Sequence, residues 1–326
     1  MNFLKKILYS EEPLEFNIRQ QIYKKNHIKI IKIYVFFIKL FRLTYKSYQR
    51  FFLRPKTRHL FQRLEKIFFI RKYKIYKSID LEKKTQELNN NGYLEINSIF
   101  TDFELKETFK YLSTDHLLEP IYTNHKKFNL KQPPSGVKTG YIDTHLLVKS
   151  KYILKAANNP NLLNILKSYF GCSFKLDWVW AWWSFPSNEL AGPQLFHRDY
   201  ESMNFLKVFV YLSDVDEFNG PHEYIIGSHK IDKLYKRERF SDQLINENFQ
   251  KDKIFTIKGK RGKTFIANTF GIHRGLQPKN KKRLVLVYLF SVVPSNRSPK
   301  LPVLTRNELE FDLKEKNINS LFVKSK

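Results

Sequence analysis

The chain has 326 residues, of which 42% are hydrophobic and 16% aromatic, enough to build a core and to exclude global disorder. Lys and Arg number 58 against 31 Asp and Glu, which gives a formal net charge of +27. Cys172 is the only cysteine, so a disulfide framework and a cysteine-rich zinc site are excluded and we expect a reducing, cytoplasmic setting. No signal peptide or transmembrane helix is predicted, because the longest uncharged apolar run, 33–38, falls far short of the roughly 20 residues that a span requires.

Residues 1–85 form a basic segment that we expect to be helical and separate from a second unit at 86–326. Residues 1–80 hold 20 Lys and Arg against 5 Asp and Glu. Within 29–50, cations recur on one face of a helix, and aromatic and aliphatic side chains cover much of the rest. This pattern is typical of a helix lying on an anionic membrane surface, and also of a helix docked on the protein with its lysines in water. A third explanation of the positive charge is a general bias in composition toward Lys, Ile, Asn and Phe, in which Lys replaces other residues at many neutral sites.

The second unit begins with well-marked boundaries. A turn is predicted at 88–92, and the alternating residues 93–96 predict a strand. Thr101, with a glutamate three residues later, forms a capping box that opens a helix over 102–112. A second helix, over 160–170, lies between an asparagine N-cap with a first-turn proline and a glycine after its last turn.

Short apolar strands dominate from about residue 174 onward. We expect strands at 178–184, 205–212, 264–268 and 284–290. Turns that contain glycine or proline separate them. Helices followed by many short strands predict a mainly β fold, a β-barrel or jelly roll with flanking helices.

Two residues of an H-x-D motif, His197 and Asp199, carry the strongest chemical signal. On an extended chain, residues two apart point to the same face, so both side chains can reach one metal ion. A second histidine then completes the two-His, one-carboxylate set of non-haem Fe(II) oxygenases, which leaves positions for a bidentate 2-oxo acid and O2. The candidates are His222, His229 and His273. We favour His273, just after a predicted strand, and interpret the other two as surface or structural histidines.

Arg283 comes ten residues after His273 and opens a strand that we expect to pair with the strand of His273 as a hairpin. An arginine there can bind the distal carboxylate of 2-oxoglutarate as a bidentate pair. The alternative is a surface arginine beside Lys281 and Lys282. Arg274 competes for this role, but it is adjacent to the proposed ligand and is expected to point away.

Together these pieces resemble the phytanoyl-CoA dioxygenase family of Fe(II)/2-oxoglutarate oxygenases. The resemblance covers about 200 residues and rests on His197-Arg-Asp199, Asn219-Gly-Pro221, Gly227-Ser-His-Lys230, Gly271-Ile-His-Arg-Gly275 and Arg283. It implies a double-stranded β-helix, the jelly-roll fold. It also implies that His197, Asp199 and His273 are catalytic iron ligands and that Arg283 anchors the cosubstrate.

The same resemblance suggests that strands 180–184 and 205–212 wall the cosubstrate pocket. Lys207, Phe209 and Tyr211 share one face of the latter strand, so Lys207 is a candidate for an additional carboxylate contact. A lysine facing solvent is the alternative. We interpret the four tryptophans as core residues rather than as a substrate platform.

The implied activity is hydroxylation of a small-molecule or lipid-type substrate. Fe(II) is the bound cofactor, 2-oxoglutarate and O2 are consumed as cosubstrates, and succinate and CO2 are released. Because Asp199 is present, the halogenase variant of this chemistry, which lacks the carboxylate, is not expected. A nucleic-acid or nucleotide demethylase is an alternative on the same fold. It is disfavoured, since those enzymes repeat an arginine six residues after the anchor and Leu289 stands there. Two hypotheses of other classes are a non-catalytic jelly-roll binding protein and a membrane adaptor built on 1–85.

Overall fold

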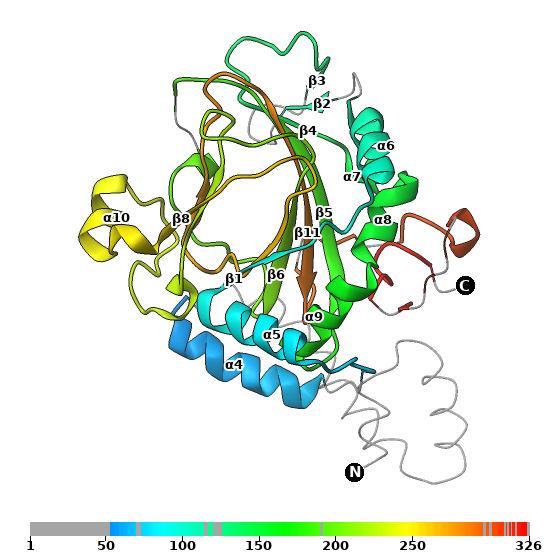
Figure 1. The fold of residues 1–326 in the computed structure, drawn as a ribbon, viewed down its shortest axis with the longest axis vertical. Coiled ribbons are helices and arrows are strands. Elements are labelled where there is room, and N and C mark those ends of the chain that lie inside the picture. Colours follow the sequence, from blue (N-terminus) through cyan, green and yellow to red (C-terminus); the bar gives the residue numbers. More distant parts are fainter. Residues whose placement is uncertain are drawn as a thin grey trace, which may run out of the picture.

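A computed structural model describes the chain from residue 53 to residue 324. The exceptions within that range are 70–72, 114–116, 120–125, 190–191, 296–297, 300–301, 310, 312, 314 and 317. The basic helix predicted at 29–50 therefore lies outside the described residues. The described part is mainly antiparallel β structure with helices against it, in agreement with the predicted fold class (Figure 1).

Local sequence signals placed two helices correctly. Helix α6, Asp102–Leu112, begins at the predicted capping box, in which the Thr101 side chain and the Glu104 side chain each bond the other residue's backbone N–H. Helix α9, Pro160–Phe170, is capped by Asn159 and ends at Gly171 in the left-handed conformation. The remaining described helices are α4 Pro55–Phe68, α5 Ile79–Asn91, α7 Thr144–Lys149, α8 Lys151–Ala157 and α10 Asp242–Asn248.

The turn predicted at 88–92 is wrong in its first four residues, which form the last turn of α5. Ser78 caps this helix, and the buried side chains of Leu81 and Leu88 fix it against the protein. Only Gly92 turns the chain, at φ 73°, and a Cβ there would collide with the hydroxyl of Tyr224. Packing of two leucines thus outweighs the low helix propensity of the asparagine run. The proposed division at 85/86 falls inside this helix.

Two antiparallel sheets form the body of the molecule. The larger has the order β1-β9-β6-β11-β5-β4-β2-β3 and the smaller β10-β7-β8. The predicted strands are all present, with ends shifted by a few residues. The strands are β1 Tyr93–Ile96, β2 Leu117–Leu118, β3 Lys127–Phe128, β4 Thr139–Tyr141, β5 Lys175–Ser184, β6 Phe205–Tyr211, β7 His222–Ile225, β8 Ile254–Ile257, β9 Thr264–Ala267, β10 His273–Gly275 and β11 Arg283–Ser291.

The predicted hairpin between the strands of His273 and Arg283 is wrong. Strand β11 lies between β5 and β6 in the larger sheet, whereas β10 pairs with β7 in the smaller one. All nine residues of β11 are buried, so this strand needs a ladder partner on each side, and a three-residue strand cannot supply one. The segment 276–282 therefore crosses from one sheet to the other.

The two faces of β11 divide the interior. Leu284, Leu286 and Tyr288 belong to the main core cluster, which also contains residues of α8 and α9. Val285 and Val287 point the other way and pack with Tyr224 and Ile257 of the smaller sheet. Helices α6–α9 accordingly lie on one side of β5 and β11, with β8 and α10 on the other (Figure 1). The space between the sheets is where a site can form.

A buried carboxylate ties the start of β5 to the end of β11. Asp177 is fully buried, and its Oδ2 accepts hydrogen bonds from Ser291 Oγ at 2.7 Å and from the Ser295 N–H at 2.8 Å. The hydroxyl groups of Ser295 and Ser298 donate to its other oxygen. These bonds hold the segment after β11 against the sheet.

We predict that Asp177→Ala lowers the free energy of unfolding by about 2–4 kcal/mol, because several buried donors lose their acceptor together. Urea unfolding followed by circular dichroism measures the change. Asp252→Ala is the matched control, since its side chain is 69% exposed, and it should stay within about 0.5 kcal/mol of wild type. Equal stabilities for the two variants would contradict the structural role of Asp177.

Candidate active site

The H-x-D segment and the start of β10 are joined as an antiparallel bridge. His197 N–H donates to the carbonyl of His273 at 2.9 Å, and His273 N–H donates back to His197 at 3.0 Å. Two residues on, Asp199 N–H donates to the carbonyl of Thr269 at 2.8 Å. The side chains of His197 and Asp199 share the face that looks toward His273, while Arg198 points away and bonds backbone carbonyls of neighbouring loops.

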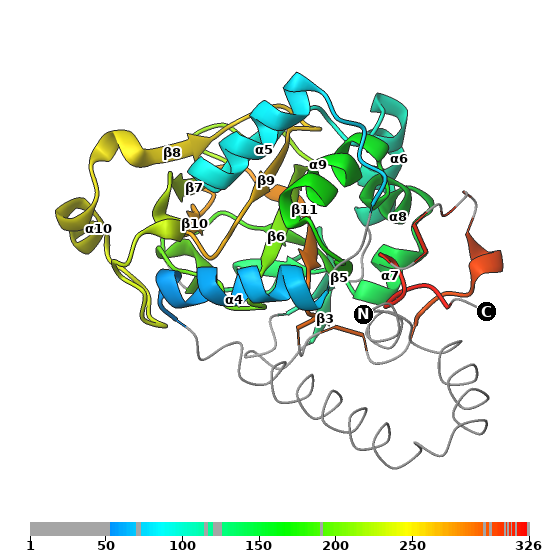
Figure 2. The ribbon, with the colours of Figure 1, turned by 90° about the horizontal axis from the view of Figure 1, so that it is seen from below.

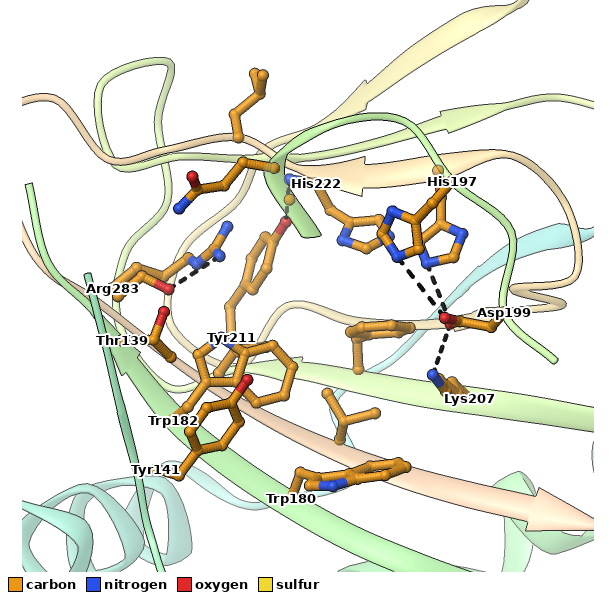
Figure 3. Close-up of a pocket in the computed structure, with 18 of the residues that line it drawn as sticks. Thr139, Tyr141, Trp180, Trp182, His197, Asp199, Lys207, Tyr211, His222 and Arg283 are labelled. Atoms are coloured by element: carbon orange, nitrogen blue, oxygen red, sulfur yellow. Dashed lines mark hydrogen bonds and ion pairs between the residues drawn. The ribbon is translucent and has the colours of Figure 1, made fainter. Parts of the chain in front are cut away.

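Three candidate ligand side chains converge at this bridge. Nε2 of His273 lies 3.2 Å from Asp199 Oδ2, and Nε2 of His197 lies 3.7 Å from Asp199 Oδ1. One ligand atom from each residue falls within 4.8 Å of the others, and no other His, Cys, Asp and Glu group among the described residues meets this criterion. Figure 3 shows the imidazole of His197 facing the carboxylate of Asp199.

Hydrogen bonds leave the ligand nitrogens of both histidines available. Nδ1 of His197 lies 2.9 Å from the carbonyl of Leu195, and Nδ1 of His273 lies 2.9 Å from that of Gly271. A carbonyl can only accept, so each ring carries a proton on Nδ1, and its Nε2 is the atom that faces Asp199 and could bind a metal ion. Burial, reinforced by His273, lowers the pKa of His197 to about 3, so this ring is neutral at pH 7.

The charge of Asp199 is balanced by Lys207 on β6. Burial alone would raise the pKa of Asp199, but the Lys207 ammonium and the two histidines hold it well below its usual range. Lys207 Nζ lies 2.6 Å from Asp199 Oδ2 and 3.2 Å from Glu201 Oε1. One carboxylate and two imidazoles whose Nδ1 atoms already have hydrogen-bond partners are a donor set that suits a divalent transition metal, so these residues fit an iron ion.

A cavity of about 310 Å³ connects this cluster with Arg283. It lies between the sheets and is lined by residues of both. The lining residues are Thr139, Tyr141, Trp180, Trp182, Ser184, Gln194, His197, Asp199, Glu201, Lys207, Phe209, Tyr211, His222, Arg239, His273, Gly275, Leu276, Arg283, Val285 and Val287. In Figure 3 the His197 cluster and Arg283 stand on opposite sides of it.

Arg283 is a buried cation at the far side of the cavity. Its side chain is buried, and Nη2 donates to Ser184 Oγ at 3.3 Å. No described acidic residue pairs with it, and its Nε has no hydrogen-bond partner among the described residues. Burial lowers its pKa, yet a guanidinium stays charged at neutral pH. Such a group is suited to an incoming carboxylate.

Two other cations, Lys207 and Arg274, are candidates for a carboxylate contact, and neither lies beside Arg283 in the cavity. Lys207 is buried rather than facing solvent, and it sits beside Asp199, across the cavity from Arg283 (Figure 3). Its contact with a cosubstrate therefore stays a prediction. Arg274 points away as expected, because its guanidinium pairs with Glu223 at 2.7 Å and Asp242 at 2.6 Å.

His222 lines the cavity, although its sequence context indicates a surface or structural histidine. It is buried as the first residue of β7, with its ring stacked on that of His273 at 5.4 Å between centroids. Its Nε2 has no hydrogen-bond partner among the described residues. Burial and His273 hold its pKa well below the usual range, so the ring is neutral. Strand β7 is difficult to predict from the sequence, because its apolar run is short and follows directly after a turn.

Of the expectations about histidine and tryptophan residues, the one for the tryptophans is partly wrong. His229 agrees with the structural alternative, because it is buried and its Nε2 lies 3.1 Å from the carbonyl of Asn89 at the end of α5. Trp183 is a core residue, but Trp180 and Trp182 line the cavity. Alternation along β5 could have separated these two from Trp183, because their side chains lie on the opposite face.

Comparisons with known proteins support a fold and leave the family open. No protein-family model matches the chain, and no curated protein sequence matches it, so the phytanoyl-CoA dioxygenase family is not confirmed. Among solved structures, the non-heme alpha ketoglutarate dependent carbocyclase SnoK from nogalamycin biosynthesis aligns with a TM-score of 0.50 and 14% identity. That alignment covers 64% of this chain and 83% of SnoK, and it shows a shared fold.

Two further structures align less closely. The non-heme alpha ketoglutarate dependent epimerase SnoN, also from nogalamycin biosynthesis, has a TM-score of 0.47 and 15% identity over 65% of this chain and 82% of its own. HygX from Streptomyces hygroscopicus, solved with nickel and 2-oxoglutarate bound, has a TM-score of 0.46 and 15% identity over 66% and 87%.

We predict that the purified chain binds one equivalent of Co(II), a spectroscopic substitute for Fe(II), and that His197→Ala or His273→Ala weakens binding by more than about 100-fold. Loss of an outer-shell partner alone typically costs about 10–100-fold, and loss of a ligand costs more. The visible absorption of Co(II) during an anaerobic titration measures both affinity and coordination.

Two controls separate ligation from general disturbance. His145→Ala removes an exposed histidine and should bind as wild type does. His222→Phe keeps an aromatic ring against Phe209 and should also retain the metal, because the predicted ligand set does not include His222. A loss of Co(II) binding in His222→Phe with retention in His273→Ala would reverse the choice of the second histidine.

Proposed function

We propose that this chain is an Fe(II)- and 2-oxoglutarate-dependent dioxygenase that hydroxylates a small-molecule or lipid-type substrate with O2. One observation carries the proposal: a His-Asp-His ligand cluster and a buried arginine without an acidic partner among the described residues lie across one cavity of about 310 Å³. The first suits a ferrous ion, and the second suits the distal carboxylate of a dicarboxylic keto acid. The fold shared with SnoK is compatible with this chemistry.

We further propose that the two facing antiparallel sheets are a double-stranded β-helix, or jelly roll. The cavity opens between them, and strands of both sheets supply its lining. Residues 86–326 would form this oxygenase unit, and residues 1–85 a basic extension. Because α5 packs against β1 and α9, and Arg58 of α4 bonds the carbonyls of Ser202 and Met203, the end of the extension would be part of the same folded body.

His197, Asp199 and His273 would hold the metal through Nε2 and carboxylate oxygen atoms. Bound Fe(II) and 2-oxoglutarate supply an oxidative decarboxylation by O2 that releases succinate and CO2 and oxidises a substrate C–H bond. Arg283 would bind and orient the keto acid by its distal carboxylate. Trp180 and Trp182 form an aromatic wall of the same space and would exclude water from it.

Lys207 has a supporting electrostatic role in this proposal. By pairing with Asp199 and Glu201, it stabilises two acidic side chains that would otherwise repel each other in a buried site. It would also fix the orientation of the Asp199 carboxylate toward the two histidines. We also propose that Lys207 contacts a carboxylate of the cosubstrate directly. This part of the proposal rests only on the position of Lys207 in the cavity lining, beside Asp199.

The central test is turnover of 2-oxoglutarate. Purified chain with Fe(II), ascorbate and O2 should convert 2-oxoglutarate to succinate, slowly in the absence of substrate, as measured by chromatography of the products. His197→Ala and Asp199→Ala should abolish the conversion, whereas His145→Ala, an exposed histidine, should leave it unchanged. Full turnover in both ligand variants would rule the assignment out. Absence of succinate in every variant would favour a non-catalytic binding protein.

A second prediction concerns Arg283. Arg283→Gln should weaken 2-oxoglutarate binding by at least about 30-fold, since truncation of one partner of a buried charge pair costs about 2 kcal/mol or more. Anaerobic calorimetry with the Co(II)-loaded protein measures this affinity. Arg261→Gln, at an exposed position, is the matched control. An unchanged affinity in Arg283→Gln, with Co(II) still bound, would place the anchor elsewhere.

A further inference from the structure

Helix α4 has its polarity reversed relative to an ordinary surface helix. Arg58 and Glu65 are only 1% and 2% exposed, whereas Leu60 and Ile67 are 58% and 62% exposed. Leu64, at 37%, lies between them on the same face, since residues spaced by three and four share one side of a helix. Three exposed apolar side chains in one stripe are costly in water and indicate a surface that something covers.

The helix is held in this orientation by polar contacts on its inner face. Arg58 Nη2 donates to the backbone carbonyls of Ser202 and Met203, and its guanidinium stacks on the ring of Phe270 at 4.2 Å. Gln62 adds a hydrogen bond of 3.0 Å to the carbonyl of Met203. Because the inner face is fixed by these directional bonds, the apolar stripe cannot turn inward without breaking them.

Positive charge lies along one side of the stripe. Lys56, Arg63 and Lys66 are exposed on the same helix, and Glu65, its only acid, is buried. Figure 2 shows α4 lying along one flank of the molecule. Leucine and isoleucine flanked by Lys and Arg, with no exposed acid on this helix, form the pattern of a helix that rests in the headgroup region of an anionic bilayer.

A small basic cavity lies beside the stripe. It measures about 180 Å³ and is lined by His59, Gln62, Arg63, Lys66, Asn89, Tyr169, Asn204, His229 and Lys230. No acidic side chain is among these described lining residues. Burial lowers the pKa of His59, and Lys230 and Arg63 lower it further, which reports a positive potential around this ring. The cavity has the size and charge to accept a phosphate group.

We propose that this outer face of α4 is a docking surface for an anionic phospholipid membrane, with Leu60, Leu64 and Ile67 inserted among the headgroups and a lipid phosphate in the basic cavity. No described helix is long and apolar enough to cross a bilayer. The proposed contact is at the level of the headgroups, because the apolar stripe is one exposed face of α4. The proposal is independent of the proposed enzymatic activity.

The position of α4 gives such docking a structural consequence. Arg58 bonds the carbonyl of Ser202, three residues after Asp199. At the other end, Arg54 Nη2 donates to the hydroxyl of Tyr235 at 3.1 Å. Tyr235 lies two residues before Arg237, which lines a second cavity that reaches His197 and Asp199. These contacts tie Arg54 and the inner face of α4 to the segments that carry Asp199 and Arg237.

The experiment is cosedimentation of the full chain with vesicles. Wild type should bind vesicles of mixed phosphatidylglycerol and phosphatidylcholine, and bind pure phosphatidylcholine vesicles much less. Leu60→Gln/Ile67→Gln should lower the partition coefficient on anionic vesicles by about tenfold or more, since each side chain contributes on the order of 1 kcal/mol on burial. Lys66→Gln/Lys230→Gln should lower it by a similar factor.

Matched controls remove the same groups elsewhere on the surface. Ile79→Gln/Phe103→Gln replaces two side chains that are 75% and 63% exposed, and Lys106→Gln/Lys131→Gln removes two exposed charges. Both should bind within about twofold of wild type. Glutamine is a good helix former, so the α4 variants should fold, and thermal melts check this.

Several outcomes would overturn the proposal. One is wild-type binding by the α4 variants, which would place any membrane contact elsewhere. Another is absence of vesicle binding by wild type, including the case in which inorganic phosphate alone occupies the basic cavity. A third is self-association that only Leu60→Gln/Ile67→Gln disrupts, measured by light scattering, which would make a second copy of the chain the occupant of this face.

Discussion

The reciprocal backbone bridge between His197 and His273 is the contact on which the candidate site depends. It joins a segment without regular structure to the edge of the smaller sheet, and it sets the two imidazoles 4.3 Å apart between ring centroids. Because strand periodicity is two residues, the same bridge directs Asp199 to the shared face and Arg198 away from it. A shift of one residue in this register would replace the carboxylate with a guanidinium.

Charge is separated across the cavity in a way that suits a dianionic ligand. At one side the acidic residues Asp199 and Glu201 are balanced by Lys207, so a metal ion would meet a site that is not excessively negative. At the other side Arg283 is a buried cation whose side chain bonds the neutral Ser184. The larger sheet supplies both Lys207 and Arg283, on β6 and β11, so its rigidity sets the distance between the two ends.

Features that depend on local chemistry were predictable from the sequence. The cap at Thr101 and the apolar runs of β6 and β11 are determined by nearby residues, and the H-x-D spacing by itself put two candidate ligands on one face. Features that depend on the pairing of strands far apart in the sequence were not predictable. The pairing of β11 with β5 and β6 is decided by burial on both faces, and His222 enters the cavity only because β7 pairs with β10. The ligand role of His273 and the anchor role of Arg283 stay predictions.

A crystal structure of the chain grown anaerobically with Co(II) and 2-oxoglutarate would test the central claim directly. It should show one metal ion bonded to Nε2 of His197, Nε2 of His273 and the carboxylate of Asp199. One 2-oxoglutarate should chelate that ion and place its distal carboxylate on the guanidinium of Arg283. A metal bound through His222 or outside this cavity, or a keto acid that leaves Arg283 uncontacted, would contradict the proposed site.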